Sequence, residues 1–409
     1  MEEKGDHVED IVIVGAGISG LATALGLHRL GIRSLVLETS DSLRAAGYAL
    51  TTWNNAWKAL DALGVADSLR LRHDRLAGNV TFSAVSGKPT SDLLFKAHRN
   101  QEGRTLMRKS LLEALAMDLP KDTIKYSSKL VSIEEEAAGF LKLLHLADGT
   151  ILKTKVLIGC DGVNSVVAKW LGLKKPSLSG RNATRGIVTY SNGHGFDNKF
   201  MWFFGKGLRF GVMPCNSNTV YWFATWRPSK QEEEIEENPT KLKEHILRKL
   251  GKVPDQARAV VEDTEVDSFV SLPLRYRHPW ELVCNNFSRS NITIAGDALH
   301  SMTPDLGQGG CSALEDGVIL ARCLGEAMSR NPNGEVEDKE EYKRIEKGLE
   351  KYAKERRWRS IKLIIASDVV GSIQESKGKV MNYLRDNILA DSLVGVLMKI
   401  SDFDCGTLS

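Results

Sequence analysis

The sequence has little cysteine, and none of it is arranged to bind a metal or to build a disulfide framework. The six cysteines of the 409-residue chain include no C-x-x-C pair, and no histidine cluster stands at metal-ligand spacing. We therefore expect reduced thiols in the core and in loops, and no metal site. A reducing, cytoplasmic location is the matching expectation.

Long hydrophobic runs and a large charge of one sign are also missing. The apolar stretch over residues 361–373 is too short to span a bilayer and is interrupted by Lys362, Ser367 and Asp368, so we expect no transmembrane segment. Residues 1–10 are acidic and polar, unlike a signal or transit peptide. The net charge of +3 gives no reason to expect nucleic acid as a partner. A small-molecule ligand is the expectation that remains.

Internal repeats and low-complexity tracts are absent as well, so the chain should form ordinary globular domains. With 42% hydrophobic and 26% charged residues, it has the composition of a folded protein. The chain is longer than a domain with one compact core usually is, so we expect two lobes, or a large domain with an inserted one. The sequence predicts no particular oligomeric state.

Three separate stretches of the sequence predict one parallel sheet. Residues 10–14 form an apolar strand, residues 21–30 have helical spacing, and residues 34–38 form a second strand, which together make a βαβ unit. Residues 156–159 and 292–295 are short apolar runs that each lead into a turn containing Asp and Gly, as buried parallel strands do.

A second, antiparallel sheet is predicted between these stretches. Residues 200–204, 209–213 and 219–226 are rich in aromatic and β-branched residues, and turn residues separate them. They are expected to form an inserted lobe.

A glycine motif follows the first strand, with Gly15, Gly17 and Gly20 in the pattern G-x-G-x-x-G. Only glycine permits the tight turn, the close approach of a pyrophosphate and the packing of helix on strand that this motif needs. The N-terminus of the helix then receives the phosphate charge. Glu38, 18 residues after Gly20, can accept hydrogen bonds from both ribose hydroxyls of an adenosine. The unit predicts a dinucleotide, with NAD and FAD both open.

Two further motifs follow the other predicted parallel strands. They are Gly159-Cys160-Asp161-Gly162-Val163-Asn164-Ser165 and Ala295-Gly296-Asp297-Ala298-Leu299-His300, the latter followed by Pro304 and by Gly307-Gln308-Gly309-Gly310. In this order and at this spacing they closely resemble the signatures of the class A flavin monooxygenases, the para-hydroxybenzoate hydroxylase-like group. Over nearly all of its length, the chain resembles the plant salicylate hydroxylase-like and zeaxanthin epoxidase-like branch of that group.

The chemistry of these residues agrees with an FAD site. The carboxylate of Asp297 can bond the ribityl hydroxyls of a flavin, a group that NAD lacks, and this favours FAD. Arg108 resembles the family arginine that contacts the FAD pyrophosphate, and a guanidinium suits phosphate oxygens. A surface salt bridge is the alternative for Arg108. The loop from Pro304 to Gly310, called the flavin loop below, has no side chain at Gly307, Gly309 and Gly310, so its backbone N–H groups can approach the flavin ring and stabilise negative charge on it.

Asp161 and Gly162 belong to the Asp-Gly signature, which in the family serves both FAD and the transient nicotinamide cofactor, NADPH or NADH. The signature usually ends with an arginine, but this chain has Ala168, next to Lys169. We therefore predict weak nicotinamide binding with little discrimination between NADH and NADPH. Cys311 stands where many relatives carry asparagine, and we expect little consequence.

The aromatic sheet is the expected substrate-binding surface. Period-two alternation places one set of side chains on one face (Val220, Trp222, Ala224) and a second set on the other (Tyr221, Phe223, Thr225), and only one face can line a cavity. Resemblance to the family's sheet favours a pocket of Trp222, with Phe210 and Val212 opposite. Ordinary core packing of these three side chains is the alternative.

No catalytic acid or base is predicted. His300 adjoins the flavin loop, but a single histidine is expected to be a hydrogen-bonded structural residue. The run Arg356-Arg357-Trp358-Arg359 could begin a helix on a membrane surface, yet a C-terminal helix packed against the FAD lobe is the stronger expectation.

The predicted fold class is α/β, with a Rossmann-like FAD-binding domain of discontinuous segments, an inserted antiparallel β-sheet substrate domain and a C-terminal helical segment. The FAD-binding domain is expected over residues 1–75, 100–175 and 285–345. The substrate domain is expected over residues 76–99 and 176–284, and the helical region over residues 346–409.

The resemblance implies an FAD-dependent monooxygenase. NAD(P)H would reduce FAD, dioxygen would add as a flavin C4a-hydroperoxide, and one oxygen atom would hydroxylate or epoxidise a small aromatic or olefinic substrate. The protein must then position the substrate and exclude water. An FAD-dependent oxidase or dehydrogenase without oxygen insertion is the main alternative, and a non-enzymatic FAD-dependent sensor is a third.

Overall fold

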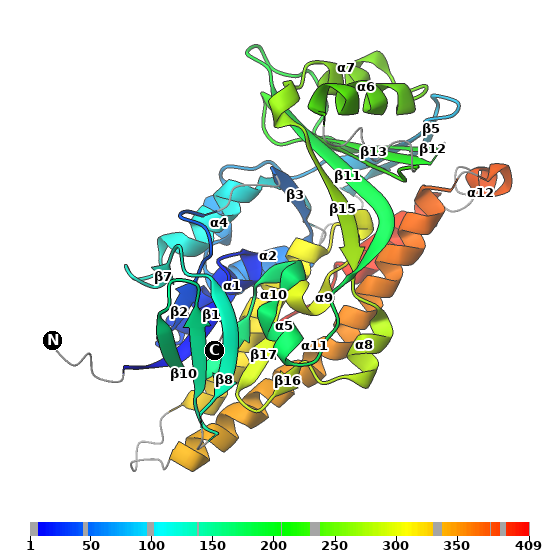
Figure 1. The fold of residues 1–409 in the computed structure, drawn as a ribbon. Helices are drawn as coiled ribbons and strands as arrows, with labels where there is room; N and C mark the ends of the chain where they lie inside the picture. The colour runs from blue at the N-terminus through cyan, green and yellow to red at the C-terminus, as the bar shows by residue number, and fades with distance from the viewer. Residues whose placement is uncertain are drawn as a thin grey trace.

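The computed structural model describes residues 7–43, 48–95, 102–136, 139–205, 207–229, 238–329, 338–376, 378–384 and 390–408. These residues form two lobes, each built around its own sheet (Figure 1). The long helix α11, Asp338–Gln374, runs beside the lower lobe in that view and continues to the sheet of the upper one.

The lower sheet has a parallel centre made of strands that are far apart in the sequence. Its order is β16-β17-β10-β1-β2-β7, and β1 pairs in parallel with both β10 and β2, while β10 pairs in parallel with β17. A β8–β9 hairpin extends this sheet from β10 in antiparallel fashion. The strands are β1 Val8–Val14, β2 Leu35–Leu37, β7 Ile124–Lys125, β8 Leu130–Glu135, β9 Lys142–Leu146, β10 Ile151–Gly159, β16 Ser288–Arg289 and β17 Ile292–Ile294.

The upper sheet has seven strands in the order β15-β11-β14-β13-β12-β4-β5, all antiparallel except the parallel pair β12 and β4. Its strands are β4 Gly78–Ser83, β5 Pro89–Leu94, β11 Ser177–Thr189, β12 Lys199–Gly205, β13 Leu208–Pro214, β14 Thr219–Trp226 and β15 Val270–Tyr276. Helices α6, Pro239–Lys249, and α7, Asp255–Glu262, cover one face of this sheet (Figure 1). A separate two-stranded sheet pairs β3, Ala49–Thr52, with β6, Arg104–Met107.

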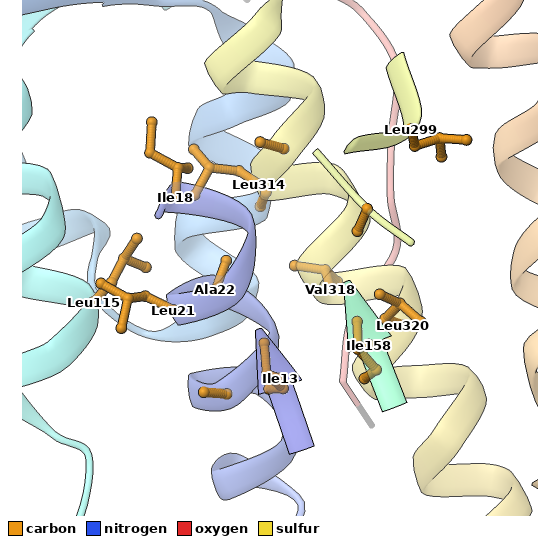
Figure 2. Close-up of a cluster of buried hydrophobic side chains, with 14 of the residues drawn as sticks. Ile13, Ile18, Leu21, Ala22, Leu115, Ile158, Leu299, Leu314, Val318 and Leu320 are labelled. Atoms are coloured by element: carbon orange, nitrogen blue, oxygen red, sulfur yellow. The ribbon is translucent and has the colours of Figure 1, made fainter. Parts of the chain in front are cut away.

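Helix α1, Ile18–Arg29, packs closely on α10, Gly309–Met328, next to the parallel strands (Figure 2). Small residues make this approach possible, because a Cβ on Gly317 would lie 2.5 Å from the Cβ of Ala22. Around the contact, Ile13, Leu21, Ile158 and Val318 form part of one apolar core. This packing fixes where the helix N-termini of α1 and α10 lie relative to the sheet.

The remaining helices complete the two lobes. They are α2 Asn54–Leu63, α3 Ala66–Arg70, α4 Arg108–Met117, η2 Gly162–Asn164, α5 Val166–Trp170, η4 Val266–Ser268, α8 Pro279–Cys284, α9 Asp297–His300, η5 Pro304–Leu306, α12 Lys379–Leu384 and α13 Ala390–Ile400. In the ranges that the structure describes, no helix is both long enough and apolar enough to cross a membrane.

The C-terminal segment packs back onto the lower lobe. The Ser401 carbonyl accepts a hydrogen bond from the Asn55 N–H at 2.9 Å, and Arg322 Nη1 donates to the Cys405 carbonyl at 2.7 Å. The guanidinium of Arg359 lies 4.5 Å from the ring of Phe403. Arg356 is fully buried in the same region, so this part of α11 packs against the protein interior.

The structure confirms the predicted fold class: a mixed α/β fold with a parallel sheet from discontinuous segments, an inserted antiparallel sheet and C-terminal helices. The domain boundaries given above stay a prediction.

Candidate functional site

The glycine motif forms the turn between β1 and α1, and its three glycines have different surroundings. Gly15 has φ +103°, and a Cβ there would lie 2.5 Å from the Cys160 carbonyl oxygen. A Cβ on Gly20 would overlap the carbonyl oxygen of Gly15. At Gly17, by contrast, a Cβ would meet no described atom within 4 Å. Gly15 and Gly20 therefore shape the turn, and Gly17 leaves an open space at the start of the helix.

This open space has the properties of an anion site. Gly17 is the N-cap of α1 and, having no side chain, cannot cap the first N–H groups of the helix. Helix N-termini carry partial positive charge and free N–H donors, which suit phosphate oxygens. The residues present thus fit a dinucleotide pyrophosphate.

Glu38, directly after β2, lies beside the glycine turn. Its Oε2 accepts a hydrogen bond from the Ala16 N–H at 2.9 Å, and its Oε1 accepts one from the Ser40 N–H at 2.9 Å. These two bonds hold the carboxylate at the end of the turn. Its contact with a ribose stays a prediction.

Asp161 and Gly162 lie in the turn after β10. Asp161 Oδ2 accepts a hydrogen bond from the Val166 N–H at 2.7 Å, whereas Oδ1 is buried and has no hydrogen-bond partner among the described residues. Burial raises the pKa of the Asp161 carboxyl. Gly162 has φ +74°, a conformation that favours glycine. The free acceptor at Oδ1 is suited to a ligand hydroxyl.

A cavity of about 360 Å³ lies between the two lobes and collects most of the remaining predicted cofactor residues. From the lower lobe it is lined by Arg108, Asp297, Pro304, Gly307, Gly309 and Gly310. Gly309 begins helix α10, and a Cβ there would meet no described atom within 4 Å. Burial lowers the pKa of Arg108, while the nearby Asp297 carboxylate opposes that shift. A second open helix N-terminus and the side chains of Arg108 and Asp297 therefore line one cavity.

The upper sheet supplies the opposite wall of the cavity through one of its faces. Its lining residues are Ala183, Arg185, Phe200, Trp202, Met213, Tyr221 and Phe223. The Trp202 and Phe223 rings are 5.3 Å apart, edge to face, and Phe200 stacks on Trp202 at 4.0 Å. The guanidinium of Arg209 lies 4.2 Å from the Trp202 ring, and burial lowers the pKa of Arg209 to about 10. This wall is aromatic, and its rings pack against one another.

The predicted substrate pocket of Phe210, Val212 and Trp222 is on the other face of the same sheet, and that assignment is corrected. Val212 pairs with Trp222 in the register of β13 and β14, and all three side chains are fully buried in the core against α6 and α7. The Trp222 indole Nε1 donates a hydrogen bond to Thr264 Oγ1 at 2.8 Å. The alternation of faces was predicted correctly, but helices α6 and α7 cover the face that was chosen.

Most of the cavity residues were not predicted as site residues from the sequence, and they include Trp53, Arg185, Tyr221 and Leu397. Tyr221 belongs to the alternate face that the period-two pattern had already defined. Leu397 comes from α13, near the C-terminus, and no local motif marks it. Arg185 is in β11, which was not among the predicted strands, so no sequence signal marked it.

His300 belongs to a buried polar network and does not line the cavity. Its Nε2 lies 2.7 Å from Asp316 Oδ2, which also accepts a hydrogen bond from the Gly296 N–H at 2.7 Å. Arg356 donates to Asp316 Oδ1 at 2.6 Å and to Glu315 Oε2 at 2.7 Å. The network joins α11 to the turn that carries Asp297, and His300 has the structural role expected of it.

A second buried cluster holds the Pro304–Gly310 loop from the upper lobe. Arg181 of β11 donates to both carboxylate oxygens of Asp305, at 3.1 and 2.6 Å, and to Glu375 Oε1 at 2.9 Å. Arg209 Nη2 donates to the Pro304 and Asp305 carbonyls at 3.4 and 3.3 Å. The loop is therefore attached to the sheet that forms the opposite wall.

Position 168 points into the protein interior. Ala168 is 3% exposed, its N–H donates to Ser165 Oγ at 2.8 Å, and the neighbouring Lys169 is exposed. Cys311 is buried beside the flavin loop, and burial raises the pKa of its thiol to about 12. Lys169 is thus the cation at this turn that solvent can reach.

The chain matches the family model described as FAD binding domain over residues 9–346. It is 56% identical over 411 residues to Monooxygenase 2 of Arabidopsis thaliana and 36% identical over 412 residues to Monooxygenase 1 of the same plant, with full coverage of all chains. Among solved structures, its fold is similar to that of Klebsiella pneumoniae HpxO complexed with FAD and uric acid, with a TM-score of 0.79 at 20% identity over 98% of this chain and 99% of that one.

A salicylate hydroxylase in its substrate complex has a similar fold, with a TM-score of 0.72 at 18% identity over 96% of this chain and 98% of that one. These matches agree with a site that combines two open helix N-termini, the side chains of Arg108 and Asp297, and an aromatic wall. The chain belongs to the FAD binding domain family and is a class A FAD-dependent monooxygenase.

Proposed function

We propose that this enzyme uses NAD(P)H and dioxygen to hydroxylate or epoxidise a small aromatic or olefinic molecule held in the cavity between the lobes. The observation that carries the proposal is the composition of that cavity. One wall has the residues that fit FAD, and the other is a packed aromatic surface of Phe200, Trp202 and Phe223.

On the cofactor side, the residues have distinct roles in this proposal. Gly17 and the N-terminus of α1 would hold the pyrophosphate of FAD, with Arg108 as a further cation, and Asp297 would bond its ribityl chain. The N-terminus of α10 at Gly309 would supply N–H groups that stabilise negative charge on the flavin ring. Bound FAD supplies the redox chemistry, because it accepts electrons from the nicotinamide and activates dioxygen.

On the substrate side, the aromatic wall binds a flat apolar body and excludes water. A dry site keeps the activated oxygen for the substrate, since water would divert it to hydrogen peroxide. Burial raises the pKa of Tyr221 to about 12, so this side chain keeps its proton at neutral pH and acts as a hydrogen-bond donor. It is therefore not a general base in this proposal.

The experiment is a compound screen on purified protein with bound FAD. NADH and NADPH consumption is measured with and without each compound, starting from salicylate and urate, because a salicylate hydroxylase and a urate complex of HpxO share this fold. Positive compounds are then turned over under isotopically labelled dioxygen. One labelled oxygen atom per product supports a monooxygenase of this specificity. Product without label, formed with no need for a nicotinamide, would instead identify an oxidase.

A further inference from the structure

Two tryptophans of helix α2 each have a buried indole N–H without an acceptor in the described part of the chain. Trp53, the N-cap of the helix, is 4% exposed, and Trp57, one turn later, is 1% exposed. Neither Nε1 has a hydrogen-bond partner among the described residues. An indole nitrogen can only donate, and a buried donor without an acceptor lowers the stability of the folded state. Each of these two groups therefore calls for an explanation.

The two indoles differ in what surrounds them. The guanidiniums of Arg70 and Arg104 lie 5.1 and 5.2 Å from the ring of Trp57, which is not among the residues that line the cavity. Trp53 does line the cavity between the lobes. A ligand in that cavity can therefore reach the indole of Trp53, whereas it cannot reach that of Trp57.

The packing of Trp53 fixes which edge of its indole faces the flavin loop. On one edge, a Cβ on Gly103 would lie 3.1 Å from Cζ3, and Phe95 meets the ring edge to face with centroids 6.0 Å apart. Nε1 is on the opposite edge, where a Cβ on Gly307 would lie 3.3 Å from it. Gly307 belongs to the flavin loop and also lines the cavity. The free N–H of Trp53 is thus beside the loop that fits the flavin ring.

The first acceptors of the flavin loop already have donors from the upper sheet. Arg209 donates to the Pro304 carbonyl at 3.4 Å, and Arg181 donates to both carboxylate oxygens of Asp305 at 3.1 and 2.6 Å. The acceptor for the indole N–H of Trp53 is therefore expected to come from the molecule that occupies the cavity.

We infer that Trp53 Nε1 donates a hydrogen bond to a carbonyl oxygen of the flavin ring when FAD is bound, and that this bond favours the reduced cofactor. The carbonyl oxygens of the ring are acceptors in both redox states and gain negative charge when two electrons are added. A donor held beside them binds the more negative form more tightly. Trp53 is then a cofactor-binding residue that raises the midpoint potential of FAD. This role goes beyond the proposed function, because it depends on neither the reductant nor the substrate.

The test makes one change at two matched positions. Trp53→Phe removes the indole N–H and keeps an aromatic ring, and Trp57→Phe does the same outside the cavity. Each apoprotein is titrated with FAD by fluorescence, and the midpoint potential of the bound FAD is measured anaerobically against a reference dye. In Trp53→Phe, oxidised FAD should bind about twofold to tenfold more weakly, and the loss for reduced FAD should be about tenfold larger. That extra tenfold lowers the midpoint potential by about 30 mV. Trp57→Phe should leave both FAD affinities within about twofold.

Infrared difference spectra between the oxidised and reduced protein provide a readout that a purely structural role would not move. A hydrogen bond lowers the stretching frequency of a carbonyl group, so one flavin carbonyl band should move to higher frequency in Trp53→Phe and stay in place in Trp57→Phe. Trp53→His keeps a ring N–H and should restore part of the FAD affinity. Thermal unfolding of each apoprotein identifies a folding defect, and if Trp53→Phe does not fold, Trp53→Leu replaces it in the same measurements.

Three results would overturn the inference. If Trp53→Phe and Trp57→Phe weaken FAD binding equally, the effect comes from the packing of α2. If FAD binds to Trp53→Phe with unchanged potential and carbonyl bands, the N–H belongs to the substrate or to water. A midpoint potential that rises in Trp53→Phe excludes a carbonyl acceptor. None of these measurements involves turnover or a nicotinamide, so their outcome is separate from the labelled-oxygen test of the proposed function.

Discussion

Gly17 and Gly20 stand three residues apart in one motif, but the structure predicts opposite effects for adding a methyl group to each. A Cβ on Gly17 meets no described atom within 4 Å, whereas a Cβ on Gly20 overlaps the Gly15 carbonyl oxygen. The backbone of Gly17 has φ −78°, which alanine adopts without strain. Gly17→Ala should therefore affect the cofactor, and Gly20→Ala should affect the fold.

The magnitudes follow from the local structure. Replacing an N-cap glycine by alanine lowers the stability of the folded state by about 0.5–1 kcal/mol. Alanine also lowers the conformational entropy of the unfolded chain, which raises stability by about 0.4–1 kcal/mol. The free energy of unfolding of the apoprotein should therefore change by less than about 1 kcal/mol. With FAD, the methyl group occupies the space for the pyrophosphate. Losing one charge-assisted hydrogen bond costs about 1.5–3 kcal/mol, which weakens FAD binding about ten- to a hundredfold.

The assay combines thermal unfolding of the apoprotein with fluorescence titration of FAD. Gly17→Ala should unfold like the unmodified apoprotein and gain less stability from added FAD, because ligand stabilisation depends on the dissociation constant. Gly20→Ala should unfold earlier even without FAD, since the backbone must shift to relieve the overlap. Unchanged FAD affinity in Gly17→Ala, or early unfolding of its apoprotein, would refute the reasoning.

Four other variants test the rest of the structure. Trp202→Ala should raise hydrogen peroxide and lower the product formed per NAD(P)H, whereas Trp222→Ala should lower thermal stability by about 3–5 kcal/mol and leave that ratio unchanged in the folded fraction. Leu397→Ala opens the cavity from the C-terminal side and should raise the peroxide share at unchanged FAD content, as measured by peroxide assay. Arg356→Gln leaves the buried carboxylate of Asp316 without its arginine and should destabilise the protein by about 3–5 kcal/mol in denaturant unfolding.

The glycine motif and the parallel strands could be predicted because each depends on short-range chemistry. A tight turn that excludes every side chain requires glycine, and a strand buried on both faces requires a continuous apolar run such as Ile11–Ile13. These requirements are visible in a few consecutive residues.

The cavity face of the aromatic sheet could not be predicted in the same way. Trp222 and Phe223 are adjacent and both aromatic, so hydrophobicity does not distinguish the two faces of β14. The deciding fact is that α6 and α7 cover the Trp222 side, and these helices begin after residue 238, beyond the sheet strands that they pack on. The period-two pattern of β14 therefore carries no information about which of its faces the helices cover.

The position of the flavin loop depends on residues that lie far outside its own sequence motif. The Pro304–Gly310 loop carries few side chains of its own, and its position depends on Arg181 and Arg209 from the sheet and on Glu375 at the end of α11. The Asp297 turn depends in turn on Asp316, which Arg356 holds. Both cofactor loops are thus attached by buried charges to α11, which also reaches the upper sheet. A change in how the lobes meet must therefore alter the loop geometry at the cofactor, because the same ion pairs join them.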